Sequence, residues 1–229
     1  MNTSFLVAAV IASTPLLLPT LGELLTEKAG HLNLGVEGMM LLGAVAGFAT
    51  GFYTNNPLLM LLGAGAAGGL GGLIFGFLTI TLRANHTVSG LTLTIFGTGV
   101  SSFAGTTFIG QKMSSEFIDS FKPVPIPLLS KIPVIGPMFF QQDFFVYLAL
   151  ALAVFLGIYL YRTRYGINLI AIGENPGAAD ASGINVDLYK YVHVVAGGAL
   201  CGLGGAYLAT VDVPQWQEQI TAGRGWIAI

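Results

Sequence analysis

The chain has 229 residues, of which 54% are hydrophobic and only 9% are charged, and its mean hydropathy is +0.76. A soluble domain carries roughly 25% charged residues, so this composition excludes a water-soluble globular protein and indicates that lipid covers most of the surface. The formal net charge is −2, and we expect no nucleic-acid partner.

Six runs with few or no charges can each cross a bilayer, which takes about 20 apolar residues per helix. They occupy residues 5–21, 33–52, 57–82, 88–109, 144–161 and 191–211. The first run has no positively charged start and no clean cleavage site, so we expect a retained helix and not a signal peptide. The predicted fold class is an all-α, polytopic transmembrane helix bundle with at least six spans. Because Ile229 ends the chain inside a further apolar stretch, GWIAI, we expect residues 1–229 to be one membrane domain that is incomplete at its C-terminus.

Glycines are concentrated in the third run. Residues 63–72, GAGAAGGLGG, contain the Gly-x-Gly-x-x-Gly spacing of dinucleotide-binding loops, but that motif requires a preceding strand and an acidic residue about 20 positions later. No Asp or Glu lies between Glu37 and Glu116, so we exclude nucleotide binding. Helices in lipid associate through small residues that let their backbones approach. The expected packing positions are Gly65, Gly68, Gly69, Gly72, Gly76, Gly198, Gly202 and Gly205.

The sequence carries no catalytic or metal-binding motif. The single cysteine, Cys201, permits neither a disulfide nor a thiolate metal site within the chain. His31, His86 and His193 are far apart and lack the spacing of metal ligands. No Gly-x-x-x-x-Gly-Lys-Ser/Thr loop is present, so the chain cannot hydrolyse ATP by itself. We expect no enzyme activity and no cofactor in this chain.

The most informative water-exposed stretch is residues 162–190, between the fifth and sixth runs. Asn175 suits an N-cap and Pro176 the first helical position, Ala178 and Ala179 favour a helix, and Gly183 suits the C′ position. These residues predict a helix of about seven residues, roughly 10 Å long, with Ala179 at its surface. Such a helix is either a docking element outside the membrane or an ordinary connecting turn.

Four stretches resemble one family of membrane proteins. Residues 162–186, RTRYGINLIAIGENPGAADASGINV, resemble the cytoplasmic loop of permease subunits of ABC importers that serve branched-chain amino acids, simple sugars and nucleosides. NLGVEGMMLLGA (33–44), RANHTVSGLTL (83–93) and TAGRGWIAI (221–229) extend the match over most of the chain. They are most similar to nucleoside or simple-sugar permeases. Such permeases usually continue well beyond the last stretch, so the incomplete C-terminus puts the completeness of a pathway in doubt.

The resemblance implies several partners. The short helix would be a coupling helix that docks on an ATP-binding subunit, which would hold ATP and Mg²⁺. A second homologous permease subunit and an extracytoplasmic substrate-binding lipoprotein would complete the importer in the bacterial cytoplasmic membrane. Nucleosides are the first expectation for the solute, simple sugars the second and branched-chain amino acids the third. The docking residues would be Glu174, Asn175, Pro176, Ala178, Ala179 and Gly183.

The resemblance also orients the chain. If residues 162–190 are cytoplasmic, alternation places residues 23–32 and 83–87 on the same side. The excess of Lys and Arg on that side then has the sign of the positive-inside rule, although the margin is small. The proline-rich loop 110–142 would lie outside, where it either lies on the membrane surface, meets the substrate receptor or merely covers the bundle.

Polar residues within the runs are candidates for a solute pathway. Glu37 sits about one turn inside the second run, where a carboxylate is costly unless it is paired or near water. It either lines the pathway or serves a structural role by bonding neighbouring backbone or Asn33. The fourth run carries a stripe at helical spacing that consists of Thr94, Thr98, Ser101 and Gly105. This stripe suits either hydroxyl-bearing solutes or interhelical hydrogen bonds. The candidate pathway residues are Asn33, Glu37, Asn85, Thr94, Thr98 and Ser101.

Two other classes of function stay open at this point. An ion-coupled secondary transporter would use Glu37 as its titrating carboxylate. A membrane scaffold would show no solute flux.

Overall fold

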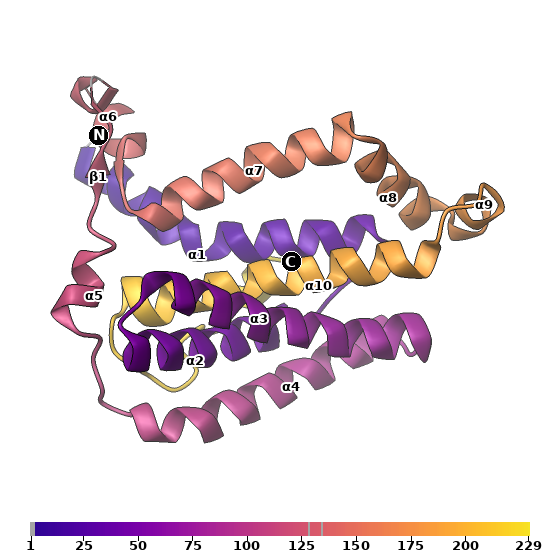
Figure 1. Ribbon diagram of the computed structural model, residues 1–229, viewed down its shortest axis with the longest axis horizontal. Helices are drawn as coiled ribbons and strands as arrows, with labels where there is room; N and C mark the ends of the chain where they lie inside the picture. The colour runs from indigo at the N-terminus through magenta and orange to yellow at the C-terminus, as the bar shows by residue number, and fades with distance from the viewer. Residues whose placement is uncertain (1–2, 128, 134) are drawn as a thin grey trace.

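The computed structural model describes residues 3–127, 129–133 and 135–229, and this part of the chain is a bundle of long helices (Figure 1). Among the described residues, six helices are long and apolar enough to cross a membrane, which confirms the predicted fold class. They are α1 (Thr3–Lys28), α2 (Val36–Thr54), α3 (Pro57–Gly76) with the π-helical turn η1 (Phe77–Thr81), α4 (His86–Gly105) with the 3₁₀ turn η2 (Thr106–Phe108), α7 (Phe144–Arg162), and α10 (Val186–Tyr207) with the π-helical turn η4 (Leu208–Asp212).

Several helices begin at a side-chain cap, outside the apolar run that predicts them. Asn85 accepts a hydrogen bond from the Val88 backbone N–H at 3.1 Å, so α4 begins at His86. Asn185 accepts from the Leu188 N–H at 3.0 Å, so α10 begins five residues before the predicted position 191. These caps satisfy backbone donors that the first turn of a helix leaves free.

The first helix extends past its predicted end at residue 21 to Lys28, and Pro15 and Pro19 lie within it. Glu23 is buried in this extension with an exposed fraction of 4%. Its carboxylate accepts hydrogen bonds from the Thr26 hydroxyl at 2.6 Å and from the Asn33 backbone N–H at 2.9 Å. The helix can therefore continue through a charged position because the carboxylate is hydrogen-bonded.

The centre of the bundle is formed by α2, α3 and α10, whose backbones meet at glycines. A Cβ atom on Gly68 would lie 2.7 Å from the Cα of Gly202, and one on Gly198 would lie 2.9 Å from the Cα of Gly72. A Cβ on Gly205 would collide with the backbone carbonyl of Met40. No side chain fits between these helices, and their approach is the close contact that small residues allow in lipid.

One predicted packing position is wrong and another is looser than expected. A Cβ on Gly65 would meet nothing within 4 Å, and one on Gly69 would make only ordinary contacts of 3.6 Å with Val195. Gly76 lies near the ring of Tyr191 instead of near backbone. Spacing of four residues places Gly65 on the same face as Gly69, but both lie at the edge of the contact between α3 and α10, where they line a shallow apolar groove.

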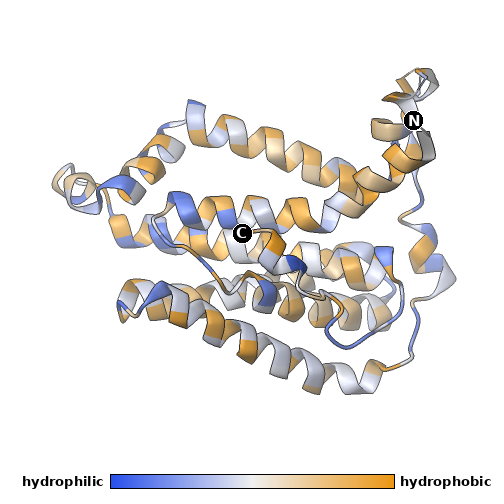
Figure 2. Ribbon diagram, turned by 180° about the vertical axis from the view of Figure 1, so that it is seen from behind, coloured by the Kyte–Doolittle hydropathy of each residue, from blue (hydrophilic) through white to orange (hydrophobic). Residues whose placement is uncertain are grey.

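The outward faces of the helices are apolar along most of their length (Figure 2). On α4, Ile95 and Phe103 have exposed fractions of 75% and 83%, and on α7, Val154 and Phe155 reach 65% and 60%. Such a continuous exposed apolar surface is unsuited to water and fits contact with lipid.

The loops gather at two opposite ends of the bundle, as alternating spans require. At one end, the rings of His31 and His86 are in contact in a tilted arrangement, with centroids 4.4 Å apart, and Gly30 lies against Gly173. At the other end, the Met113 backbone N–H donates to the Pro214 carbonyl at 3.0 Å. Residues 23–32, 83–87 and 162–190 therefore share one end.

The segment from residue 110 to 142 covers the opposite end with short elements (Figure 1). The side chains of Ser114 and Asn55 hydrogen-bond at 2.5 Å, which ties the segment to the end of α2. The phenol of Tyr147 donates to the Val124 carbonyl at 3.0 Å. The elements are α5 (Ser115–Asp119), β1 (Val124–Pro125), η3 (Leu129–Lys131), α6 (Ile135–Phe139) and β2 (Gln141–Gln142), with β1 and β2 antiparallel.

Three further helices lie outside the six spans. The first two, α8 (Arg164–Glu174) and α9 (Pro176–Ala181), follow α7, and α11 (Arg224–Ile227) lies near the C-terminus. The sequence reasoning predicts α9 but misses α8. Thr163 caps α8 by accepting from the Gly166 N–H at 3.1 Å, while Leu169 and Ile172 are buried beneath it.

Candidate functional site

The short helix α9 has a well-defined start and end. Asn175 accepts a hydrogen bond from the Ala178 N–H at 3.1 Å, and Pro176 occupies the first helical position. Gly183 has φ of +79°, its N–H donates to Asp180 O at 2.8 Å, and the Ile184 N–H donates to Ala179 O at 3.2 Å. This pair of bonds is a Schellman motif, in which glycine takes the left-handed conformation that other residues avoid.

The exposure of α9 differs from the expectation at one residue. Ala179 has an exposed fraction of 5%, so it faces the rest of the chain and does not present a docking surface. Ala178, Asp180 and Glu174 are exposed. With six residues α9 has under two turns, and packing against α8 and α10 holds its one buried side chain. Any partner must therefore contact the face that carries Ala178.

Glu37 anchors a largely irregular segment, residues 213–229, which enters the bundle and whose helical part is the short α11. Its Oε1 accepts from the Thr221 hydroxyl at 2.5 Å and from the Gly223 N–H at 2.9 Å, and its Oε2 accepts from the Gly225 N–H at 2.6 Å. The exposed fraction of Glu37 is 6%. Three donors satisfy a carboxylate that burial alone would strongly disfavour. The sequence leaves Glu37 between a pathway and a structural role, and these contacts favour the structural one.

The anchored segment runs from the end of η4 back toward the middle of the bundle. Trp216 packs on Phe48 with ring centroids 5.5 Å apart. Gly225 lies against Glu37, which is roughly three helical turns nearer the start of α2. The C-terminus lies midway along the bundle in both views (Figures 1 and 2). Backbone without regular helix at membrane depth is tolerated only where protein buries it or where it lines a water-filled cavity.

Two of the other predicted pathway residues hold loops in place. Asn33 has an exposed fraction of 1%, and its Oδ1 accepts from the Gly35 N–H at 2.9 Å. Asn85 is the exposed cap of α4. Neither side chain has a hydrogen bond to a residue of the α4 stripe among the described residues.

The predicted stripe on α4 faces α2 and the anchored segment. The Thr94 hydroxyl donates to the Leu34 carbonyl at 3.1 Å, and the Thr98 hydroxyl donates to Thr94 O at 2.8 Å. Gly105 lies against the indole of Trp216. Ser101 Oγ and Trp216 Nε1 are buried polar atoms with no hydrogen-bond partner in the described part of the chain. Thr94 therefore bonds the loop before α2 and Thr98 bonds its own helix. Within the stripe, the buried polar atom without a partner in the described residues is Ser101 Oγ.

Sequence reasoning misses Trp216, which has an exposed fraction of 2%. Its partners Phe48 and Gly105 lie more than 100 positions away in the sequence, and no local pattern links them. The available local signal is that Trp216 follows Pro214 soon after an apolar run. This position is typical of a tryptophan at the membrane interface, so the signal points to the wrong environment.

A six-span bundle with a capped helix at one end and a broken segment entering its interior defines a multi-pass membrane transport subunit. The chain belongs to the family described as branched-chain amino acid transport system / permease component, whose sequence profile matches residues 5–229. This family consists of ABC transporter permeases, which are transport components and not enzymes.

Named relatives cover nearly the whole chain. It is 41% identical over 227 residues to a putative glucose ABC transporter permease of Haloferax volcanii, with 97% of this chain and 67% of the relative aligned. A guanosine ABC transporter permease of Bacillus subtilis is 33% identical, with 97% and 72% aligned. A nucleoside ABC transporter permease of Lactococcus lactis is 35% identical, with 100% and 74% aligned. No solved structure matches the chain.

Proposed function

We propose that this chain is the membrane permease of an ATP-driven importer in the bacterial cytoplasmic membrane, and that α9 is the coupling helix that docks on the ATP-binding subunit. The observation that supports the docking role is that α9 has a defined start and end at its caps while most of its residues are exposed. ATP and Mg²⁺ bind to the partner, and closure of the ATP-binding subunits pushes α9 and tilts the attached helices.

The solute is a nucleoside or a simple sugar, because the named relatives carry these solutes in their names. A second homologous permease and a substrate-binding lipoprotein complete the importer. The segment 110–142 lies at the end opposite α9 and is the surface that the lipoprotein meets. The buried, unpaired atoms Ser101 Oγ and Trp216 Nε1 lie where α4 meets the anchored segment and are the groups best placed to meet hydroxyl groups of a solute.

The docking test is Ala178→Arg, with Ala171→Arg on α8 as the matched control, since both alanines are exposed at the same end of the molecule. Ala178→Arg places bulk and charge at the docking face, and loss of a hot-spot contact costs on the order of 2 kcal/mol or more. We expect unchanged membrane levels, loss of co-purification with the ATP-binding subunit and loss of ATP-dependent uptake. The control retains both.

Wild-type co-purification and uptake by Ala178→Arg would show that α9 is only a connection.

The energy source is tested separately in vesicles with radiolabelled nucleoside and glucose. Uptake by the importer survives an uncoupler of the proton gradient and stops on ATP depletion, whereas an ion-coupled transporter behaves in the opposite way.

A further inference from the structure

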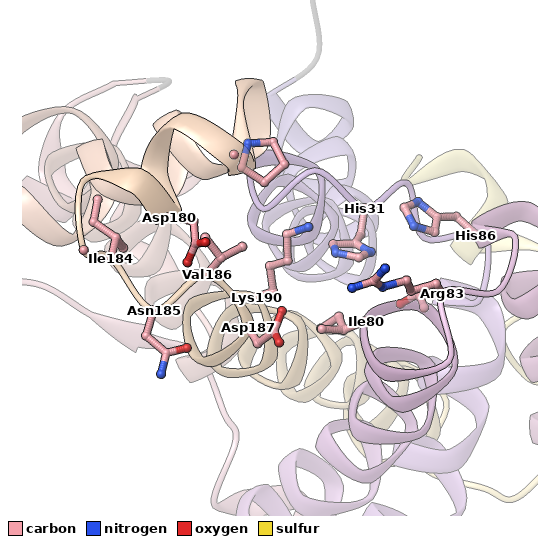
Figure 3. A pocket seen from close by; sticks show the side chains of 14 residues that line it. His31, Ile80, Arg83, His86, Asp180, Ile184, Asn185, Val186, Asp187 and Lys190 are labelled. Atoms are coloured by element: carbon pink, nitrogen blue, oxygen red, sulfur yellow. The ribbon is translucent and has the colours of Figure 1, made fainter.

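A polar cavity of about 810 Å³ lies beside α9, between the loop after α1, the link between α3 and α4, and the start of α10 (Figure 3). Its volume is in the range of small-molecule sites, roughly 300–1,000 Å³. One wall of the cavity is formed by residues of α9 and its cap, including Pro176 and Gly183, but Ala178, which marks the proposed docking face, does not line it. The proposed transport pathway, toward Ser101 and Trp216, does not reach it either.

Nitrogen-bearing side chains from three separate elements meet at one side of this cavity. Figure 3 shows the Lys190 amine of α10 and the Arg83 guanidinium pointing toward the ring of His31, with the tilted ring of His86 beside it. Sequence reasoning places these histidines far apart, but the fold brings their rings to 4.4 Å. The described residues contain one ion pair, Lys122 with Asp119, so neither Arg83 nor Lys190 has a carboxylate within bonding distance.

His31 is the least expected member of this group. Its exposed fraction is 2%, and neither ring nitrogen has a hydrogen-bond partner in the described part of the chain. Burial, with a contribution from the charge of Lys190, lowers the pKa of His31 to about 3. The ring is therefore neutral near pH 7 and offers one N–H donor beside two cations.

Two carboxylates also line the cavity, one away from His31 and one beside Lys190. Figure 3 shows Asp180 of α9 close to Val186, away from His31, and Asp187 below the stem of Lys190. Asp187 therefore partly offsets the charge of Lys190 without forming an ion pair with it, while the Lys190 amine and the Arg83 guanidinium both lie toward His31. The first residues of α4 and α10, His86 and Val186, also line it, and helix N-termini favour negative ligands.

We propose that this cavity binds a phosphate-class oxyanion through Arg83, Lys190 and His31. The guanidinium provides a planar pair of donors, the ammonium a point charge and the imidazole a neutral N–H, which together suit a tetrahedral oxyanion. A soluble phosphorylated molecule and a phospholipid headgroup both carry such an oxyanion. Both can reach the cavity because it lies at the end of the membrane helices. The inference does not depend on the identity of the transported solute.

The test uses the full-length permease with its partner subunits, and it measures the temperature at which the tagged chain leaves the soluble fraction. A ligand that binds only the folded state raises this midpoint as its concentration rises. One arm titrates inorganic phosphate in neutral detergent, with chloride at matched ionic strength. The other arm compares nanodiscs of phosphatidylglycerol with nanodiscs of phosphatidylcholine.

The variants are Arg83→Gln and Lys190→Gln, with Arg164→Gln as the control because Arg164 is an exposed cation at the same end outside the cavity. We expect the wild type and the control to gain stability from phosphate, from phosphatidylglycerol or from both. Each cavity variant should bind about tenfold more weakly, because one charge-assisted hydrogen bond is lost.

A response to phosphate alone identifies a soluble ligand, and a response to phosphatidylglycerol alone identifies a headgroup. The proposal is overturned if neither anion shifts the wild-type midpoint, or if both cavity variants keep the wild-type shift. Uptake is not measured here, so failure of the docking model leaves this result intact.

Discussion

The helices α2, α3 and α10 and the helices α7, α8 and α9 belong to one chain but are held in different ways. Within the most apolar stretch of α10, 67% of the residues are buried, whereas the figure for α7 is 28%. The first group meets through glycine backbones. The second is tied to α10 by polar contacts such as Tyr159 Oη with His193 Nε2 at 2.8 Å and Asn168 Nδ2 with Tyr189 Oη at 3.2 Å.

This difference suits the transmission of force. Close-packed backbones without room for a side chain cannot shift by small amounts, because any change of separation loses many contacts at once. The second group is held by a smaller buried apolar cluster, which includes Leu156, Leu160 and Leu169, and by a few hydrogen bonds. Because fewer of its residues are buried, it can tilt at a lower cost. The helix that we propose as the docking site, α9, therefore belongs to the more loosely held group.

The largest expected effect concerns the tightly packed group of α2, α3 and α10, called the tight group below. Gly68→Leu places a side chain where a single Cβ would already lie 2.7 Å from Gly202, whereas a Cβ on Gly65 would meet nothing within 4 Å. We expect Gly68→Leu to lower the free energy of unfolding by about 3 kcal/mol or more and Gly65→Leu to leave it nearly unchanged. The yield of monodisperse protein and its melting temperature measure this. Equal losses in both variants would mean that glycine packing does not define the core.

The next prediction tests whether the C-terminal segment is held in place as firmly as the tight group. Glu37→Ala leaves the Gly223 N–H, the Gly225 N–H and the Thr221 hydroxyl without an acceptor, which costs about 2 kcal/mol or more. Trypsin should then cleave at Arg224 faster than in the wild type. Glu27→Ala is the control, because Glu27 is an exposed carboxylate of α1. Unchanged cleavage after Glu37→Ala would show that the segment is held by other contacts.

The sequence is sufficient to predict the six spans and the caps of α9, because both depend on local chemistry. A run of apolar residues defines a span wherever it lies, and Asn175, Pro176 and Gly183 act within one turn of their own positions. It is not sufficient to tell Gly65 from Gly68, since spacing fixes the face of a helix but not the distance to its neighbour.

Long-range partners are the main reason for the remaining errors. Glu37 and Thr221 lie in two stretches that resemble the permease family, yet nothing in either stretch shows that they bond each other. The burial of Ala179 depends on how α9 lies against α8 and α10, which a helix of six residues does not specify by itself.

A smaller effect concerns the cavity between the two groups. The pKa of His31 is about 3 in the folded chain and about 6.5 in an unfolded one, so only the unfolded state gains this proton as the pH falls below 6.5. Lowering the pH from 7 to 5 should therefore cost the wild type about 2 kcal/mol more than His31→Gln. Melting temperatures of both proteins at the two pH values measure this. Parallel pH profiles would show that His31 is not held neutral.

The smallest effect compares one substitution in both groups. The helices α3 and α9 both begin with Asn-Pro, at Asn56 and Asn175, and each asparagine caps its helix by accepting backbone N–H bonds. Replacing a cap by alanine costs about 1 kcal/mol. Because α3 unfolds only with the bundle, Asn56→Ala should lower the melting temperature. Because α9 can open alone, Asn175→Ala should leave it unchanged.

Hydrogen exchange separates the two outcomes. After Asn175→Ala, amides 177–184 should exchange about fivefold faster, which corresponds to about 1 kcal/mol of local opening, while amides 58–65 keep their wild-type rates. After Asn56→Ala, protection should fall across α2, α3 and α10 together. If Asn175→Ala instead lowers the melting temperature as much as Asn56→Ala does, α9 opens only with the bundle. The arm would then be as rigid as the core, and force applied at α9 would have to move the bundle as one body.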